Sequence, residues 1–399
     1  MGRVYLDHNA TTPLRAEARA AMVAAMDVVG NPSSVHAEGR AAKMLVERAR
    51  AQVAGLVGCL PNQVVFTGSA TEAAALAVAQ KGRHGGRFAA LPTEHDCLLD
   101  WSDAELPTLF DVDGKLNVDG ALALWDWVMG AVGDEWSADR GDVALVACSA
   151  ANSETGVMLP DRVVAGSNRI SALRAGTVSY ATVCDITQVA GKVPVAFAPK
   201  REAPDERDVP AYMILSSHKL GGPKGVGALI NFTRDDPQAI LRGGGQEMGR
   251  RSGTENVIGI AGFGAAAEAA QADVEAGKWD RVEKLRNILE TALEAASNTT
   301  IFIGKGAERL PNTSCFATPG WKGETQVMQM DLAGFAISAG SACSSGKVKA
   351  SRVLTAMGLS DVAANAVRVS LGLETTEDEV LRFAEVWAQK LKKHEARAA

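Results

Sequence analysis

The 399-residue chain lacks a long hydrophobic run, a signal-like N-terminus and an excess of positive charge. No apolar stretch approaches the roughly 20 residues that a membrane-spanning helix needs. Residues 1–7 contain no apolar core of a signal peptide. The net charge of -6 leaves no basic footprint for nucleic acid. We therefore expect a cytoplasmic protein that binds neither a membrane nor nucleic acid.

The six cysteines lack the spacing of a disulfide framework or of a metal site. None of them forms a CxxC pair, and their density is far below that of secreted scaffolds. Cys148, Cys184 and Cys315 lie in or beside apolar runs, where we expect small buried side chains. No metal site is predicted from this pattern.

The chain does contain alternating helical and strand-like segments, which favours an α/β architecture. Its 47% hydrophobic content is enough for a large core. The apolar runs do not alternate, as expected for a sheet that is covered on both faces. The sequence predicts helices at 14–29, 36–57, 71–81, 255–276, 278–297 and from 376 onward, and strands at 63–67, 87–91, 143–149, 178–184, 212–216 and 226–232. We expect a large domain over residues 14–255 and a small domain made of residues 1–13 and 256–399.

Two charged residues, Asp185 and Lys219, follow apolar runs that are predicted to be strands. Charged groups at strand ends lie at the rim of an α/β core, where ligands collect. A desolvated lysine can act as an amine nucleophile, and a buried carboxylate needs a cationic partner. The pair therefore predicts a pyridoxal phosphate bound to the lysine, with the aspartate keeping the ring nitrogen charged.

Three other features suit the same cofactor. Residues 66–72 run from a strand into a helix, and the first amides of that helix, with the hydroxyls of Ser69 and Thr71, could hold a phosphate. An ordinary capped turn has the same pattern. His95 could stack on a pyridine ring or transfer a proton, although a lone histidine is more often a surface or core residue. Gln188 could donate a hydrogen bond to the ring's phenolic oxygen.

Two further residues could act on a substrate. Arg368 is a single cation in an apolar run, and a buried arginine needs either a substrate carboxylate or an internal ion pair. Residues 338–346 are small and predict a flexible surface loop that carries Cys343. A thiol on such a loop could visit a buried site and swing out, provided that its thiolate is activated locally. An incidental exposed cysteine is the alternative.

Eight stretches of the chain, in order, resemble the cysteine desulfurases, which are pyridoxal-phosphate enzymes of fold type I in the class V aminotransferase group. They extend over nearly the whole chain. The stretches are YLDHNATTP (5–13), GNPSSVHAEG (30–39), FTGSATE (66–72), TEHDCLLD (93–100), DITQVAGKVPV (185–195), SSHKLGGPKGVGAL (216–229), GGGQEMGRRSGTENV (243–257) and SAGSACSSG (338–346). The resemblance implies a large domain with a mostly parallel seven-stranded sheet and a smaller α/β C-terminal domain.

The resemblance also implies the reaction, in which sulfur is removed from L-cysteine to leave L-alanine. Lys219 would bind the cofactor as a Schiff base and remove the substrate's Cα proton, while Asp185 pairs with the pyridine nitrogen. Arg368 would bind the substrate carboxylate. Cys343 would take the sulfur as a persulfide and pass it to an acceptor such as an iron–sulfur scaffold protein. The loop around Cys343 is similar to that of the NifS/IscS group.

The remaining roles that the resemblance implies concern the cofactor. His95 would stack on the ring, and Gln188 would contact the phenolic oxygen. The residues that would hold the phosphate are Ala70, Thr71, Ser216 and His218. Thr254 would reach the same phosphate from the partner subunit of a homodimer.

One position departs from the family pattern. The family has two consecutive asparagines before Glu-x-Gly, whereas this chain has Asn152 followed by Ser153. Ser153 is still expected at the cofactor site, but its hydroxyl is shorter than an asparagine amide. Two alternatives stay open: a selenocysteine lyase or another class V lyase, which would share every cofactor residue, and a sulfur-carrying module that has lost turnover.

Overall fold

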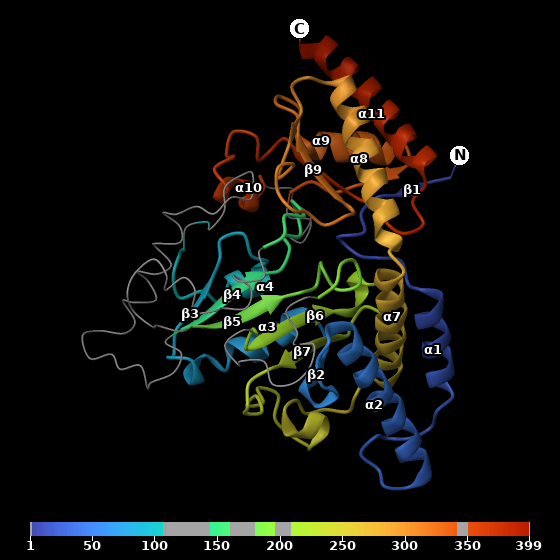
Figure 1. Cartoon of the computed structure of the whole chain (residues 1–399), viewed down its shortest axis with the longest axis vertical. Coiled ribbons are helices and arrows are strands. Elements are labelled where there is room, and N and C mark those ends of the chain that lie inside the picture. Colours follow the sequence, from blue (N-terminus) through green and yellow to red (C-terminus); the bar gives the residue numbers. More distant parts are fainter. Residues whose placement is uncertain are drawn as a thin grey trace, which may run out of the picture.

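The computed structural model of the chain describes residues 2–106, 108, 144–159, 180–195, 209–340 and 350–398. Figure 1 shows a large unit with a twisted sheet and a smaller unit that is built mainly from the C-terminal residues. The N-terminus lies beside the smaller unit, next to the last helix. Among the described residues, no helix is long and apolar enough to cross a membrane.

The large unit contains a mixed sheet with six strands among the described residues. The strands are β2 (Val64–Thr67), β3 (Phe88–Ala90), β4 (Leu145–Ser149), β5 (Ala181–Asp185), β6 (Tyr212–Ser216) and β7 (Gly227–Asn231). Their order is β2-β7-β6-β5-β4-β3. The four strands from β3 to β6 pair in parallel, and β7 pairs antiparallel with both β6 and β2. The expected α/β fold with a mainly parallel sheet is confirmed, and the expected number of seven strands stays a prediction because the structure describes only part of the chain.

Helices cover both faces of this sheet because its strands alternate apolar side chains between two cores. Met213 and Leu215 of β6 pack into one core, and Ile214 between them packs into the other. The helices of the first face are α1 (Ala16–Met26), α2 (Ala37–Val57) and α7 (Val257–Glu275), and those of the second face are α3 (Ala70–Val78) and α4 (Asp96–Leu99). The predicted helices therefore agree with the observed ones to within a few residues.

Helix α7 packs in the core of the large unit, although its residues are predicted to belong to the small domain. Ile260 and Phe263 of α7 are buried in the same core as Val53 of α2 and Phe66 of β2. The reason is the composition of α7, which has small apolar residues on several sides and so fits between neighbouring helices. The domain boundary itself stays a prediction.

Among the described residues, the smaller unit combines two small sheets with four helices. One sheet has the antiparallel order β11-β9-β8, and the other pairs β1 with β10 in parallel. The strands are β1 (Val4–Tyr5), β8 (Ile301–Phe302), β9 (Thr313–Ala317), β10 (Phe335–Ala336) and β11 (Ala366–Ser370), and the helices are α8 (Lys278–Ala296), α9 (Gly323–Leu332), α10 (Arg352–Ala356) and α11 (Glu377–Ala398). Trp321, Phe316 and Trp387 form the centre of this core. Val4 of β1 is buried in the same core, so the N-terminal strand belongs to the smaller unit.

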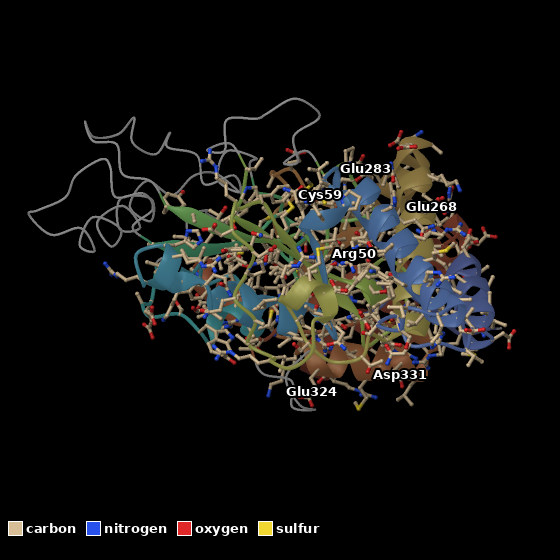
Figure 2. All side chains as sticks on the ribbon, turned by 90° about the horizontal axis from the view of Figure 1, so that it is seen from below. Arg50, Cys59, Glu268, Glu283, Glu324 and Asp331 are labelled. Carbon is tan, nitrogen blue, oxygen red and sulfur yellow. The ribbon has the colours of Figure 1, made fainter. Side chains whose placement is uncertain are left out.

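A buried ion pair fixes the glycine-rich loop of residues 243–254 against the large unit. Both terminal nitrogens of Arg50 donate to the carboxylate of Glu247, at 2.7 and 2.8 Å. The same carboxylate accepts the backbone N–H of Phe66 at 2.9 Å. Figure 2 shows Arg50 toward the middle of the molecule, whereas Asp331 lies at its edge. These bonds hold Glu247 in a left-handed conformation with φ of 49°.

Candidate active site

The two charged residues predicted at strand ends lie at one edge of the sheet. Asp185 is the last residue of β5, and Lys219 ends the single 3-10 turn that follows β6. Because β5 and β6 are adjacent parallel strands, their carboxyl ends meet at this edge. Both side chains line one cavity of about 300 Å³.

Most of the other predicted site residues line the same cavity. They are Ala70, Thr71, His95, Ser153, Gln188, Ser216, His218 and Arg368. Thr254 does not line it within a single chain and instead borders a separate hollow beside Phe66 and Gly68. Cys343 lies outside the described residues.

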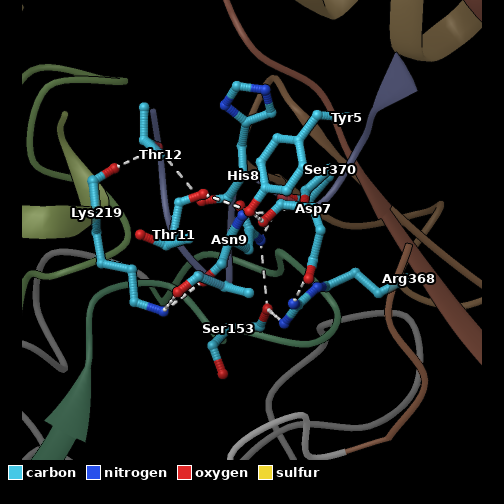
Figure 3. A network of polar contacts seen from close by, with 12 residues as sticks. Tyr5, Asp7, His8, Asn9, Thr11, Thr12, Ser153, Lys219, Arg368 and Ser370 are labelled. Atoms are coloured by element: carbon cyan, nitrogen blue, oxygen red, sulfur yellow. Dashed lines mark hydrogen bonds and ion pairs between the residues drawn. The ribbon is translucent and has the colours of Figure 1, made fainter. Parts of the chain in front are cut away.

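The amine of Lys219 is held by the N-terminal segment of the chain (Figure 3). Its Nζ donates to the backbone oxygens of Asn9 at 2.5 Å and Ala10 at 2.8 Å. The hydroxyl of Thr12 donates to the backbone oxygen of Lys219 at 2.8 Å. Asn9 is fixed in turn, because its own N–H donates to the hydroxyl of Ser370 at 3.0 Å. The lysine therefore sits between the large sheet and a segment that is anchored on β11.

Arg368 forms an internal ion pair and also lines the cavity. Its terminal nitrogens donate to the carboxylate of Asp7 at 2.8 Å and to the backbone oxygen of Ser153 at 2.9 Å. Its Nε is buried and has no hydrogen-bond partner in the described part of the chain. Unsatisfied buried donors are rare, and a guanidinium in a cavity wall is suited to a carboxylate ligand.

The cavity wall includes the start of α3 and the turn after β6. The hydroxyl of Ser69 caps α3 by accepting the backbone N–H of Glu72 at 3.1 Å, so the first turn of the helix begins at Ala70. The Nδ1 of His218 lies 3.0 Å from the hydroxyl of Thr11. Burial and the nearby Lys219 lower the pKa of His218 to about 4, which keeps its imidazole neutral at neutral pH.

His95 also has a defined orientation. It caps the short helix α4, and its Nδ1 accepts the backbone N–H of Cys97 at 3.1 Å. A nitrogen that accepts a hydrogen bond carries no proton, so in the neutral ring the proton is on Nε2. The ring can therefore contact a ligand as an aromatic face or as a single N–H donor.

The chemistry of these groups fits pyridoxal phosphate. A phosphate ester is suited to a helix N-terminus with nearby hydroxyls. A protonated pyridine nitrogen is suited to a carboxylate such as that of Asp185, and the aldehyde is suited to the amine of Lys219. The Gln188 amide supplies a donor at the same cavity.

Comparison with known proteins gives the family. Residues 4–383 match the class-V aminotransferase family. The chain belongs to this family. A cysteine desulfurase of Cereibacter sphaeroides is 37% identical over 97% of this chain and 95% of its own length. A cysteine desulfurase of Frankia sp. (strain EuIK1) is 39% identical over 97% of this chain and 90% of its own length.

Solved structures agree with this assignment. A NifS-like protein superposes with a TM-score of 0.79 at 28% identity, covering 98% of this chain and 99% of the other. A NifS-like protein from Rickettsia africae superposes with a TM-score of 0.78 at 26% identity. The resemblance to NifS/IscS-like cysteine desulfurases is confirmed by these relatives over nearly the full chain, and class-V aminotransferases depend on pyridoxal phosphate.

Two acidic residues that were not predicted from the sequence, Glu94 and Glu154, also line the cavity of this class-V aminotransferase. Glu94 accepts the backbone N–H of Ser149 at 2.8 Å and also its hydroxyl. Burial raises the pKa of Glu94 to about 7. Glu154 accepts the hydroxyl of Ser351 at 2.5 Å, and burial raises the pKa of this carboxyl as well. The signal in the sequence was their position beside His95 and Ser153.

The replacement of the second asparagine leaves the Arg368 contact intact. Ser153 binds Arg368 through its backbone oxygen, which any residue at this position would supply. Asn152, the first of the pair, caps the following turn by accepting the N–H groups of Glu154 and Thr155, each at 2.9 Å. Serine in place of asparagine therefore changes only the contacts that the side chain of residue 153 makes in the cavity.

Proposed function

We propose that this protein is a cysteine desulfurase that uses pyridoxal phosphate to remove sulfur from L-cysteine and releases L-alanine. The observation that carries the proposal is the position of Lys219, Asp185 and Arg368 in the wall of one cavity. An amine, a carboxylate and a guanidinium there match the aldehyde, the ring nitrogen and the substrate carboxylate. The names of the full-length relatives support the same activity.

Four side chains would hold the cofactor ring. Lys219 would bind it covalently, Asp185 would pair with its nitrogen, His95 would lie against its face and Gln188 would donate to its phenolic oxygen. When bound, pyridoxal phosphate supplies an electron sink that stabilises negative charge at the substrate Cα. The negative carboxylate of Asp185 would stabilise the positive charge on the ring nitrogen and so keep that nitrogen protonated.

The phosphate would be held at the start of α3 and after β6. The groups concerned are those of Ala70, Thr71, Ser216 and His218. We propose that Thr254 completes this set from the partner subunit of a homodimer. Its position in a separate hollow of its own chain supports a contribution across an interface.

The chain's own groups would carry the reaction. Arg368 binds the substrate carboxylate, and the amine of Lys219 accepts the proton from Cα. The thiolate of Cys343 then attacks the substrate sulfur, so that a new S–S bond forms while the Cβ–S bond breaks. Cβ keeps the bonding electron pair and takes a proton, and Cα regains the proton that Lys219 accepted, which gives L-alanine and a persulfide on Cys343.

Residues on both sides of the segment that carries Cys343 line the cavity. Gly340, three residues earlier, lines the cavity, and three extended residues span at most about 11 Å. Arg352 and Val353, after the segment that carries Cys343, line it too. A thiol tethered at this distance can meet the substrate and then transfer sulfur to an acceptor such as an iron–sulfur scaffold protein.

The test is to add pyridoxal phosphate to the purified protein, record its visible absorbance and then supply L-cysteine with a reductant. We expect a visible band and many equivalents of both alanine and sulfide per protomer. At most one equivalent of alanine would favour a sulfur carrier over an enzyme. Competition between cysteine and selenocysteine would separate a desulfurase from a selenocysteine lyase. Lys219→Ala is the control, and borohydride should trap no cofactor adduct in it.

A further inference from the structure

Lys192 is a buried lysine. It has no role in the reaction or in the cofactor contacts proposed above. It is 4% exposed and follows β5 by a short turn. Its Nζ donates to the side-chain oxygens of Gln188 at 3.0 Å and Asn9 at 3.3 Å. Within the described ranges, no carboxylate lies within ion-pair distance of this nitrogen. Burial of an amine without a carboxylate partner costs free energy, so we expect this lysine to have a function.

The contacts of Lys192 determine how the two amides are turned. Nζ is a hydrogen-bond donor, so each amide must direct its oxygen toward it. The nitrogen of Gln188 then faces the other way and donates to the backbone oxygen of Asn9 at 3.0 Å. The same oxygen accepts Nζ of Lys219 at 2.5 Å. The Gln188 amide is thereby held beside the amine of Lys219, and as far as the described residues show, its second N–H is left for a ligand.

Asn9 is held from several sides, which makes the arrangement rigid. Its side-chain oxygen also accepts from Asn312 at 3.0 Å, and its side-chain nitrogen donates to the hydroxyl of Thr313 at 2.9 Å. Asn312 and Thr313 lie at the start of β9 in the small unit, whereas Gln188 and Lys192 follow β5 and Lys219 follows β6 in the large one. Lys192 therefore acts on a junction of both units.

We propose that Lys192 is a positioning residue of the desulfurase, which holds the Gln188 amide with its nitrogen directed at the phenolic oxygen of the cofactor ring. Removal of Lys192 would take away the donor to the amide oxygen, so that among the described residues the amide would be held only through its nitrogen, on the backbone oxygen of Asn9. The inference rests on the proposed function, since it assumes that Lys219 binds pyridoxal phosphate.

The charges around Lys192 are compatible with this role. Burial, followed by the nearby Lys219 and Arg368, lowers the pKa of Lys192 to about 7. The amine donates to amide oxygens in either protonation state, so the orientation holds on both sides of this pH. The pKa of His8 is lowered to about 4 by burial, which leaves this neighbour neutral.

Two other charged residues in these surroundings, Arg368 and Asp273, form ion pairs. Arg368 binds Asp7, and Asp273, which lines the same cleft as Lys192, binds both Arg15 and Lys278 at 2.6 Å. These pairs leave Lys192 as the cation in contact with the two amides.

The test is a pH titration of the visible absorbance of the cofactor-loaded protein. A hydrogen bond to the phenolate stabilises the deprotonated form, so its loss raises the midpoint of the titration. We expect Lys192→Met and Gln188→Leu each to raise it by about one pH unit. In the Gln188→Leu background, Lys192→Met should raise it less than half as much, because residues that act through one another are not additive.

Lys278→Met is the matched control, since it removes a lysine from the same cleft without touching either amide. Its midpoint should equal that of the wild type. Should Lys192→Met not fold, Lys192→Gln keeps one N–H donor and should show a smaller rise of the same sign.

If the midpoint of the absorbance titration in the Lys192 variant that folds equals that of the wild type, the inference on Lys192 is wrong. It is also wrong if the shifts caused by the Lys192 substitution and by Gln188→Leu simply add. Either result leaves the proposed function standing. A wild-type protein that gains no visible band with pyridoxal phosphate would overturn both the inference and the proposed function.

Discussion

Replacement of Arg368 by lysine tests substrate binding with a magnitude that follows from the geometry. The guanidinium has one terminal nitrogen on Asp7, one on the Ser153 backbone, and an Nε without a partner among the described residues. Lysine keeps the charge but cannot hold a carboxylate through two parallel N–H groups. Loss of one charge-assisted hydrogen bond is about 1.5–3 kcal/mol, so KM for L-cysteine should rise about 10- to 100-fold in Arg368→Lys.

The expected effect falls on KM, with kcat within a few-fold of the wild type, because the carboxylate is bound equally in substrate and transition state. Alanine formation at several cysteine concentrations measures both constants. Arg50→Lys is the matched control: Arg50 is equally buried and paired with Glu247, but it does not line the cavity. It should lower the melting temperature and leave KM unchanged. An unchanged KM in Arg368→Lys, or an equal rise in Arg50→Lys, would refute the reasoning.

Three more predictions concern other parts of the site. Cys343→Ala should keep the visible absorbance of the cofactor but form alanine at below about 1% of the wild-type rate, and full activity would exclude this thiol as the nucleophile. Because burial raises the pKa of Glu94 to about 7, the stability that its protonated form confers is present at acid pH and is lost as the pH rises from 4.5 through 7. The melting temperature of Glu94→Gln apoprotein, relative to the wild type, should therefore rise by about 2 °C between pH 5 and pH 8, and a constant difference would contradict the raised pKa. Finally, Thr254→Ala and Lys219→Ala homodimers, each impaired alone, should regain activity when subunits are exchanged, because one site of the mixed dimer contains both residues. Absence of recovery, with mixed dimers shown to form, would place Thr254 in its own subunit's site.

The elements around the site could be predicted because their signals are local. The apolar run before Asp185 and the one before Lys219 each form a strand that is buried among apolar neighbours. Parallel pairing then brings both strand ends to one edge. The small-residue composition of α7 was also visible in the sequence, but the core that it joins was not, because helix packing depends on partners elsewhere in the chain.

The succession of most strands and helices along the chain, the chemistry available at the strand ends and the family of the protein are readable from local patterns in the sequence. Only the tertiary structure decided that Asn9 binds the amine of Lys219, that Asp7 pairs with Arg368, and that Lys192 lies buried against two amides. These contacts join residues hundreds of positions apart, or depend on burial that both units create together. Periodicity and turn residues act within a few positions, so the elements were predictable. Local sequence patterns carry no information about contacts over such distances, so the junction of the two units was not.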